Sequence, residues 1–281
     1  MTRRIGAYVL PGDATWLDRT LPAYYGLVDE LVVPVPTDGR GWTGAPIEVE
    51  RCLEIVRAVD TRGLLRIVEG RWTRPDDPLA ADTAQRQAAV DALSPSVDWV
   101  LQVDNDELLP DPTVLRTAID RAEELGVVGV EVPMRVVFRR TRRHVFEVAC
   151  TDGSPHHEYP GPLVVRAGAR LVDARRADGP FLRLVVAGGD RSLQVGRPAE
   201  PGELREATLS AEQAVVHNSW GRPSADIRRK VHSWGHANDT KQRRYFWAVW
   251  WPAPLTWWAL RDFHPFARGL WPRLLRRRGD A

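Results

Sequence analysis

The sequence predicts an α/β protein with a doubly wound mixed sheet and a Trp-rich, helical C-terminal extension. Three observations predict it. Short apolar, β-branched runs alternate with segments of helical spacing in residues 1–106, and strand-like runs then follow one another with little helix between them. Finally, eight of the 12 tryptophans lie from Trp220 onward.

The first part of the chain alternates between strands and helices. Strands are expected where apolar residues run without interruption, at 5–10, 31–35, 64–68 and 98–103. Helices are expected where apolar residues recur at helical spacing, at 13–25, 47–59 and 82–93. Asp82 or Thr83 is expected to cap the last of these helices. Strands that are separated by helices are joined by right-handed crossovers, so these four strands should be parallel.

The pattern changes after residue 106. One more helix is expected at 112–125. Further strands are expected at 127–134, 136–139, 144–150, 163–166, 181–186 and 215–216, which indicates a mixed sheet with long loops. From Ser224 the chain is expected to be helical and aromatic to its end. We therefore divide it into a domain of residues 1–220 and an extension of residues 221–281.

The composition is that of an ordinary globular protein, with 43% hydrophobic and 27% charged residues. The 39 Lys and Arg residues nearly balance the 37 Asp and Glu residues, so the net charge of +2 gives no reason to expect a nucleic-acid partner. Cys52 and Cys150 form no CxxC pair, and the sequence contains no run of 18 apolar residues. These features favour a cytoplasmic protein, either free or at the inner face of the membrane.

The most informative motif is the acidic turn Asp104-Asn-Asp-Glu107, which follows the apolar run at 98–103. Ligands of open α/β sheets bind outside the carboxyl ends of the strands, so this strand brings carboxylates to the binding edge. Side chains two residues apart on an extended chain share a face. Asp104 and Asp106 are therefore expected to hold one hard cation, Mn²⁺ or Mg²⁺. The alternative is a solvated turn that caps the following helix.

The acidic turn and the preceding stretch Asp82-Thr-Ala-Gln-Arg-Gln-Ala-Ala-Val90 resemble GT-A-fold glycosyltransferases, in particular the family-2-like group with its DxD motif. The resemblance covers residues 1 to about 130. It implies a nucleotide-binding half at 1–106 and an acceptor half at 107–220. Arg86 matches a residue at a helix start that approaches the donor, and a guanidinium suits a diphosphate because it binds bidentately.

The resemblance implies a metal-dependent glycosyltransferase with a nucleotide-sugar donor and, as acceptor, a glycan, a lipid-linked sugar or a small molecule. It favours inversion of the anomeric configuration. The sequence departs from the family where the second strand ends in Pro34-Val-Pro36, because many members have an aspartate there that reads uracil. Asp38 lies slightly later and is expected to take that place. Asp13 is the other candidate near the base or ribose.

His217 follows a short strand and resembles, in position, the downstream histidine that completes the metal site of many GT-A enzymes. Imidazole binds Mn²⁺ well beside carboxylates. Lys230 and His236 are expected to line the donor or acceptor pocket. The alternative for each of these residues is an ordinary structural role.

An inverting transferase needs a base that takes the proton from the acceptor hydroxyl, and a carboxylate can serve. Glu158 is the first candidate, in the loop that opens the acceptor half, and Asp190 is the second. His156 and His157 are further candidates in the same loop as Glu158. The alternative is that each is a loop residue.

Two other functions remain open. A Mg²⁺-dependent nucleotidyl- or phosphotransferase would be expected to carry a glycine-rich phosphate loop, and the sequence contains no GxxxxGK[ST]. A non-catalytic carbohydrate- or membrane-surface-binding protein would explain the tryptophans but would leave the acidic turn without a role.

The aromatic residues of 245–271 are followed by Arg273 and by three arginines at 276–278. Three interpretations are open for residues 245–281. The segment packs on the domain, or it contacts a membrane surface, where tryptophan and arginine favour the headgroup layer, or its rings stack on sugars.

Overall fold

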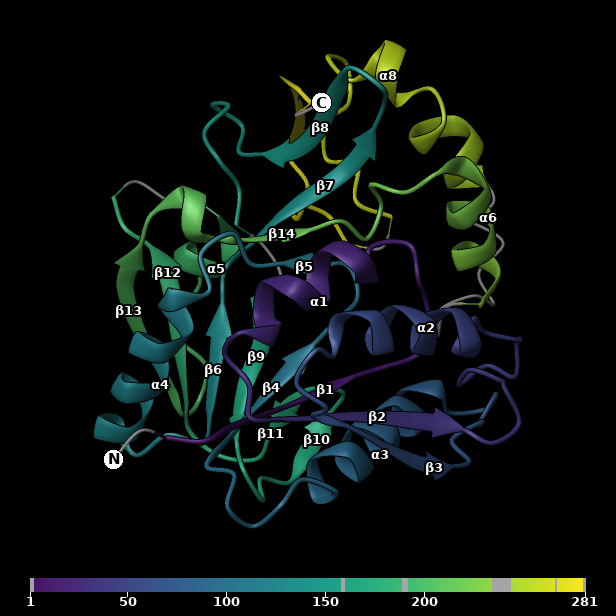
Figure 1. Ribbon diagram of the computed structural model, residues 1–281. Helices are drawn as coiled ribbons and strands as arrows, with labels where there is room; N and C mark the ends of the chain where they lie inside the picture. Colours follow the sequence, from purple (N-terminus) through teal and green to yellow (C-terminus); the bar gives the residue numbers. More distant parts are fainter. Residues whose placement is uncertain (1–2, 158–159, 189–191, 234–243, 266, 280–281) are drawn as a thin grey trace.

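The computed structural model describes residues 3–157, 160–188, 192–233, 244–265 and 267–279. Two sheets organise this part of the chain, one of eight strands and one of five, and a two-stranded hairpin accompanies them (Figure 1). The predicted α/β class with a large mixed sheet is confirmed.

The eight-stranded sheet has the order β13-β12-β6-β9-β4-β1-β2-β3. Its strands are β1 Ile5–Val9, β2 Glu30–Pro36, β3 Leu65–Gly70, β4 Trp99–Val103, β6 Gly129–Val132, β9 Gly161–Arg166, β12 Phe181–Val186 and β13 Glu203–Leu209. β1 pairs in parallel with both β2 and β4, and β2 pairs in parallel with β3, as the crossovers required. β9 runs antiparallel to both β4 and β6, which makes the sheet mixed.

Helices cover both faces of this sheet (Figure 1). On one face, α1, α2 and α4 pack apolar side chains such as Leu21, Leu53 and Ile119 into the main hydrophobic core. On the other face, α3 packs Ala89 and Val90 against the sheet. The helices are α1 Leu17–Tyr25, α2 Val49–Val59, α3 Pro78–Asp91 and α4 Thr113–Leu125. The predicted helices therefore form, with shifted first residues.

The shift that matters for the site concerns α3, which begins at Pro78 and not at residue 82. The side chain of Asp77 accepts a hydrogen bond from the backbone N–H of Ala80 at 3.1 Å, so Asp77 is the cap. Proline suits the first helical position because its φ is fixed near the helical value and because the N–H that it lacks would have no partner in the helix there. The predicted cap at Asp82 or Thr83 is wrong. Arg86 therefore lies well inside α3, one turn after Asp82, and not at a helix start.

The five-stranded sheet has the order β15-β8-β7-β14-β5. Its strands are β5 Glu107–Leu108, β7 Met134–Arg140, β8 His144–Ala149, β14 Val215–His217 and β15 Arg273–Arg278. The expectation that the chain stays helical to its end is wrong at β15. This strand pairs antiparallel with β8 and buries Leu274 completely, so it satisfies the backbone groups of what would otherwise be a sheet edge.

The helical part of the extension comprises α6 Ser224–Ser233, a π-helical turn at Phe246–Trp250 and α8 Ala253–Thr256. It packs on β7 and β8 at the top of Figure 1. Trp250 is fully buried, and its indole N–H donates to the carbonyl oxygens of Phe138 at 2.9 Å and Trp220 at 3.1 Å. Phe138 of β7 belongs to the same apolar cluster as Trp250. The expected domain boundary near residue 220 therefore divides the chain into two stretches that share one hydrophobic core.

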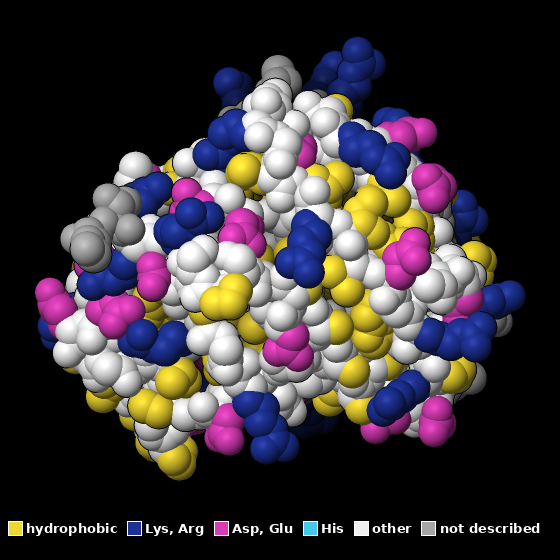
Figure 2. All heavy atoms as spheres, turned by 60° about the horizontal axis from the view of Figure 1, so that its bottom comes forward, with side chains coloured by type: hydrophobic (Ala, Val, Ile, Leu, Met, Phe, Trp, Pro, Cys, Tyr) yellow, Lys and Arg dark blue, Asp and Glu magenta, His cyan; other side chains and the backbone are white. Residues whose placement is uncertain are grey.

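The remaining elements are short: α5 Leu193–Gly196, a 3₁₀ turn at Ala211–Gln213, and a hairpin of β10 Leu171–Asp173 and β11 Arg176–Ala177. Figure 2 shows the underside of the molecule as seen in Figure 1, where basic and acidic side chains alternate. This alternation agrees with the small net charge. Among the helices in the part of the chain that the structure describes, none has the length and hydropathy needed to cross a membrane.

Candidate functional site

The candidate site lies where the strand order reverses. β2 and β3 continue to one side of β1, whereas β4 lies on its other side. In open α/β sheets, ligands bind outside the carboxyl ends of the strands at such a switch point. Asp13 follows the end of β1, and the acidic turn follows the end of β4. The acidic turn lies 91 to 94 residues after Asp13 in the sequence. The fold nevertheless brings Asp13 and the turn to the same edge of the sheet.

Hydrogen bonds hold the acidic turn in place. The Asn105 side-chain amide donates to the carbonyl oxygens of Leu10 at 3.0 Å and Asp13 at 2.5 Å, so it joins the ends of β4 and β1. From α1, Thr20 Oγ1 donates to the carbonyl oxygen of Asn105 at 2.9 Å. Tyr24, one turn later, donates its hydroxyl to the carbonyl oxygen of Glu107 at 2.8 Å.

The acidic turn does not cap α4. That helix begins at Thr113, where the side chain of Asp111 accepts a hydrogen bond from the Thr113 N–H at 3.1 Å. The carboxylates of the turn instead bind arginine side chains from three other segments, so the helix-cap interpretation is wrong.

Asp104 binds two buried arginines. Arg86 from α3 donates to its Oδ1 at 2.9 Å, and Arg175 from the β10–β11 turn lies 3.5 Å from its Oδ2. Burial raises the pKa of Asp104, but the guanidinium groups of Arg175 and Arg86 outweigh it and hold that pKa well below its ordinary value. Arg86 also donates to Asp82 at 2.5 Å. Asp104 is therefore a carboxylate held ionised by its partners.

Asp106 and Asp13 share Arg222. The Nη2 of Arg222 donates to Asp106 Oδ2 at 2.5 Å, while its Nη1 forms an ion pair with Asp13. On the other side of Asp106, His217 Nε2 lies 3.7 Å from Oδ1. Arg222 thus bridges the carboxylate after β1 to the second carboxylate of the turn.

Glu107, next in the turn, lies almost completely buried against Arg175. The two Nη atoms of Arg175 donate to the two carboxylate oxygens at 2.6 Å each. Pairing of β14 with β5 sets His217 opposite Glu107, which explains how a histidine 110 residues away reaches this edge. Burial raises the pKa of Glu107, because the charged form loses its hydration.

We call these residues the carboxylate–arginine cluster: Asp13, Asp82, Asp104, Asp106, Glu107, Arg86, Arg175 and Arg222. It contains five carboxyl groups and three guanidinium groups. Burial also raises the pKa of the Asp82 carboxyl. An excess of buried carboxylates is stabilised by protons or by an additional cation. The excess of carboxyl groups can therefore be balanced by protons on Asp82 and Glu107 or by a cation.

The donor chemistry of Asp104, Asp106 and His217 fits Mn²⁺ or Mg²⁺, which take carboxylate oxygens and, for manganese, imidazole. His217 Nδ1 is buried and has no hydrogen-bond partner in the structure. However, no three His, Cys, Asp or Glu side chains among the described residues are arranged closely enough to form a preformed metal centre. Guanidinium groups occupy the carboxylates, so a cation would have to exchange with them.

Asp38 lies after β2 and contacts its own loop and the segment that follows β3. It accepts hydrogen bonds from the Arg40 N–H at 3.1 Å and the Thr73 hydroxyl at 3.2 Å. These bonds, that from Arg40 first, lower the pKa of its carboxyl. Beside it, Trp42 donates to Gln85 at 2.7 Å, and Gln85 donates to the carbonyl oxygen of Pro34 at 2.8 Å. The loop after β2 is thereby fixed to α3.

Six further residues belong to the predicted site. Glu158, Asp190 and His236 lie outside the described residues. Lys230 lies within α6, and its side chain is likewise outside the described part. His156 and His157 are almost completely buried.

Sequence reasoning missed Arg175 and Arg222. Arginine provides 37 of the 39 basic residues in this chain, so a single arginine carries little signal. Ala174, which precedes Arg175, has a φ of 46°, a left-handed conformation that turns the hairpin. Arg222 lies five residues after His217, and this proximity was the only sequence feature that could have placed Arg222 near the site.

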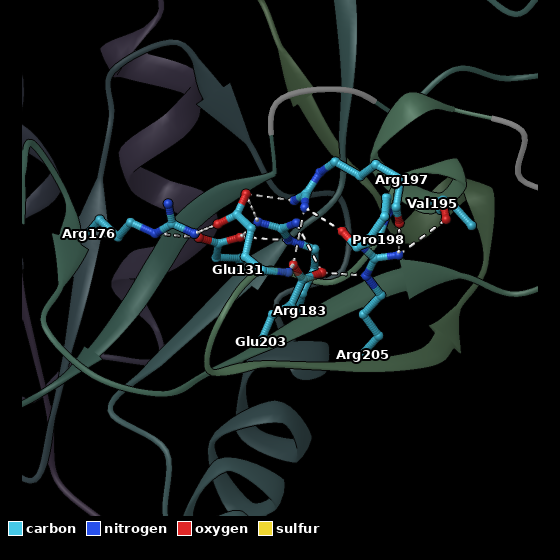
Figure 3. Close-up of polar contacts among 9 residues, drawn as sticks. Glu131, Arg176, Arg183, Val195, Arg197, Pro198, Glu203 and Arg205 are labelled. Carbon is cyan, nitrogen blue, oxygen red and sulfur yellow. Dashed lines mark hydrogen bonds and ion pairs between the residues drawn. The ribbon is translucent and has the colours of Figure 1, made fainter.

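A second buried ionic cluster lies away from the switch point, at the β6–β12–β13 end of the sheet (Figure 3). Arg183 of β12 donates to Glu131 of β6 at 2.5 and 2.8 Å and lies 3.0 Å from Glu203 of β13. Burial raises the pKa of Glu131 to about 8. This cluster joins three neighbouring strands, which indicates a structural role.

A surface groove of about 580 Å³ lies between α3 and the β10 segment, lined by side chains that include Thr83, Gln87 and Arg170. None of its lining residues belongs to the carboxylate–arginine cluster. The groove is therefore separate from the cluster, whose carboxylates are held in ion pairs with arginines.

Solved structures match the chain at low sequence identity. No protein-family model matches the chain, and no curated protein matches it. Among solved structures, 4-diphosphocytidyl-2C-methyl-D-erythritol synthase of Anaerococcus prevotii aligns with 12% identity over 59% of this chain and 71% of its own, with a TM-score of 0.32. Rv0371c of Mycobacterium tuberculosis aligns with 14% identity over 83% of this chain and 100% of its own, with a TM-score of 0.32. At this level of similarity, function must be argued from the residues of this chain.

Proposed function

We propose that the protein is a metal-dependent glycosyltransferase that moves a sugar from a nucleoside diphosphate donor to an acceptor, with inversion at the anomeric carbon. One observation carries the proposal. The carboxylates of Asp104 and Asp106 lie at the switch point of the mixed sheet, among buried arginines and with more carboxyl than guanidinium groups. This is the place where such sheets bind ligands and the charge pattern that binds a cation.

Asp104 and Asp106, with His217 beside them, would hold the Mn²⁺ or Mg²⁺ ion. When bound, the ion would neutralise charge on the departing nucleoside diphosphate. A cation that binds the two carboxylates also weakens their hold on the arginines. Arg86 and Arg222 then supply guanidinium groups suited to bidentate binding of a diphosphate, while Arg175 stays bound to Glu107.

The remaining roles follow the same proposal. Asp13 and Asp38, at the ends of β1 and β2, would contact the ribose and base. Glu158 or Asp190 would take the proton from the acceptor hydroxyl. Lys230 and His236 would line the donor or acceptor pocket. Residues 1–106 would form the nucleotide-binding half and 107–220 the acceptor half.

A second candidate is a Mg²⁺-dependent nucleotidyltransferase, which would use the same carboxylates. One observation favours it: every carboxylate of the described cluster pairs with a guanidinium group, so none is a ready base. A phosphate acceptor that is already ionised needs no base. Release of pyrophosphate from a nucleoside triphosphate would identify this reaction.

Thermal unfolding of the full chain with nucleotides tests the proposal. UDP, GDP, dTDP and CMP are each added with Mn²⁺, with Mg²⁺ and with EDTA, and CTP with Mg²⁺ tests the second candidate. A ligand at 100 times its Kd stabilises by about 2.7 kcal/mol, which is roughly 5–10 °C in Tm for a chain of this size. Stabilisation by one nucleoside diphosphate only with metal supports the transferase and names the base. Equal Tm values under all conditions would contradict both candidates.

A further inference from the structure

Four large apolar side chains are exposed together on the C-terminal extension. Trp247 is 61% exposed, Trp251 52%, Leu255 80% and Trp258 64%. They are spaced by four, four and three residues along a segment of nearly continuous helical turns, so they share one side of it. The rings of Trp247 and Trp251 lie 6.1 Å apart, centroid to centroid. We call these four residues the aromatic patch.

The opposite side of the same segment is anchored. Phe246, Trp250 and Ala253 are buried in the apolar cluster on β7 and β8. Phe246 stacks on Trp250 at 5.1 Å, and the Trp250 indole is hydrogen-bonded to two backbone carbonyls. The segment is therefore apolar on both sides. The buried side accounts for its packing on the domain, and the aromatic patch remains uncovered.

Basic side chains surround the patch. Arg244 lies one turn before Trp247 and is exposed. Arg261 is exposed and donates to the carbonyl oxygen of Trp258 at 2.9 Å. The guanidinium of Arg276 lies 5.3 Å from the centre of the Trp257 ring. Residues 244–265 and 267–279 contain seven arginines and a single acidic residue, Asp262, so the segment is basic even though Arg277 pairs with Glu147 of β8.

We propose that the aromatic patch docks on an anionic lipid surface. Tryptophan rings insert at the depth of the headgroups, where one edge is apolar and the other is hydrated. Arginines beside them bind anionic headgroups. A folded protein partner would have to offer an acidic surface and a complementary shape, whereas a lipid surface adapts to four protruding side chains. Residues 244–265 and 267–279 carry more arginines than acidic residues, so their positive charge is complementary to the negative charge of an anionic lipid surface.

This inference does not depend on the proposed function, but it bears on the acceptor. Trp220 accepts a hydrogen bond from Trp250 through its carbonyl, and Arg222, two residues later, binds Asp106 and Asp13. The docked segment is thus joined to the carboxylate–arginine cluster by a short, hydrogen-bonded stretch of chain. A lipid-linked sugar acceptor would be available at that surface.

Flotation of the full chain with vesicles tests the proposal. Vesicles of phosphatidylcholine and phosphatidylglycerol in equal parts are compared with phosphatidylcholine alone, at low and high salt. We expect the chain to float with the anionic vesicles and to do so less at high salt. The variant Trp247→Ser/Trp251→Ser/Leu255→Ser/Trp258→Ser should lose at least about tenfold in partitioning, because the inserted apolar surface is gone.

A matched control replaces two exposed apolar residues elsewhere, Leu79→Ser/Val172→Ser, and should float like the original chain. Unfolding curves show that each variant is folded. If the fourfold variant does not fold, Arg244→Gln/Arg276→Gln serves instead and should weaken flotation with anionic vesicles only. Absence of flotation at low salt, or unchanged flotation of both variants, would overturn the proposal. So would a dimer in sedimentation that the fourfold variant converts to monomer, because the patch would then bind a second copy.

Discussion

Arg175 of the β10–β11 turn binds Glu107, the last residue of the acidic turn and the first of β5, through two hydrogen bonds of 2.6 Å. Glu107 is only 2% exposed. This pair fixes a distant hairpin to the end of β4. It also makes Arg175 the partner that two carboxylates share, since Asp104 lies 3.5 Å from the same side chain.

Arg175→Met should therefore destabilise the chain by about 3–5 kcal/mol, the usual loss when one partner of a buried ion pair is removed. The cause is the uncompensated burial of Glu107. The double variant Arg175→Met/Glu107→Leu should recover much of that loss, because no buried charge remains unpaired. Urea denaturation measures both. A single variant within about 1 kcal/mol of the original chain would contradict the assigned pairing.

Asp106→Asn should remove most of the metal-dependent stabilisation by a nucleoside diphosphate. The amide has no charge with which to hold a divalent cation, so we expect a loss of more than about tenfold in metal affinity. Asp104→Asn should behave similarly. Titration calorimetry with Mn²⁺ in the presence of the nucleotide measures the effect. Asp91→Asn, an exposed aspartate at the end of α3, is the control, and a loss of equal size there would point to a non-specific charge effect.

The pKa of Glu131, raised by burial from 4.5 to about 8, predicts a pH dependence of stability. Between these two values the folded chain keeps the proton that the unfolded chain releases. The free energy of unfolding contributed by this group therefore falls as the pH rises through that window. Glu131→Gln should flatten the curve of Tm against pH between 5 and 8. Glu124→Gln, at an exposed ion pair with Arg121, should leave it unchanged.

Trp250→Ala should cost about 3–5 kcal/mol, because a fully buried indole leaves a cavity under the extension. Trp251→Ala, at the next position but half exposed, should change stability by no more than about 0.5 kcal/mol. Urea denaturation followed by circular dichroism separates the two. Equal losses would show that the buried and exposed sides of the segment are wrongly assigned.

Asp77→Ala should destabilise α3 by about 1 kcal/mol through loss of its cap. The neighbouring exposed residue provides the control: Asp76→Ala should have little effect. Thermal unfolding measures the difference. If the two variants have the same Tm, Asp77 does not cap the helix.

The sequence predicted the alternation of strands and helices in residues 1–106 because each element there has a strong local pattern. The strand expected at 98–103 forms as β4 Trp99–Val103, with every residue buried. The cap of α3 was missed because Asp77 and Pro78 precede the part of the helix with clear apolar spacing. β15 was missed because Arg273–Arg278 is too polar to read as a strand by itself.

The sequence alone determined the α/β class, the parallel core of the first four strands, and the position of a carboxylate pair at the end of the fourth. Those features depend on hydrophobic period and on residues adjacent in the chain. Only the tertiary structure decided what the carboxylates bind. Arg86, Arg175 and Arg222 come from a helix, a hairpin and the segment after β14, and pairing of β14 with β5 brings His217 beside Asp106. No local pattern encodes these partners, because ion pairs form between segments that only the sheet order brings together.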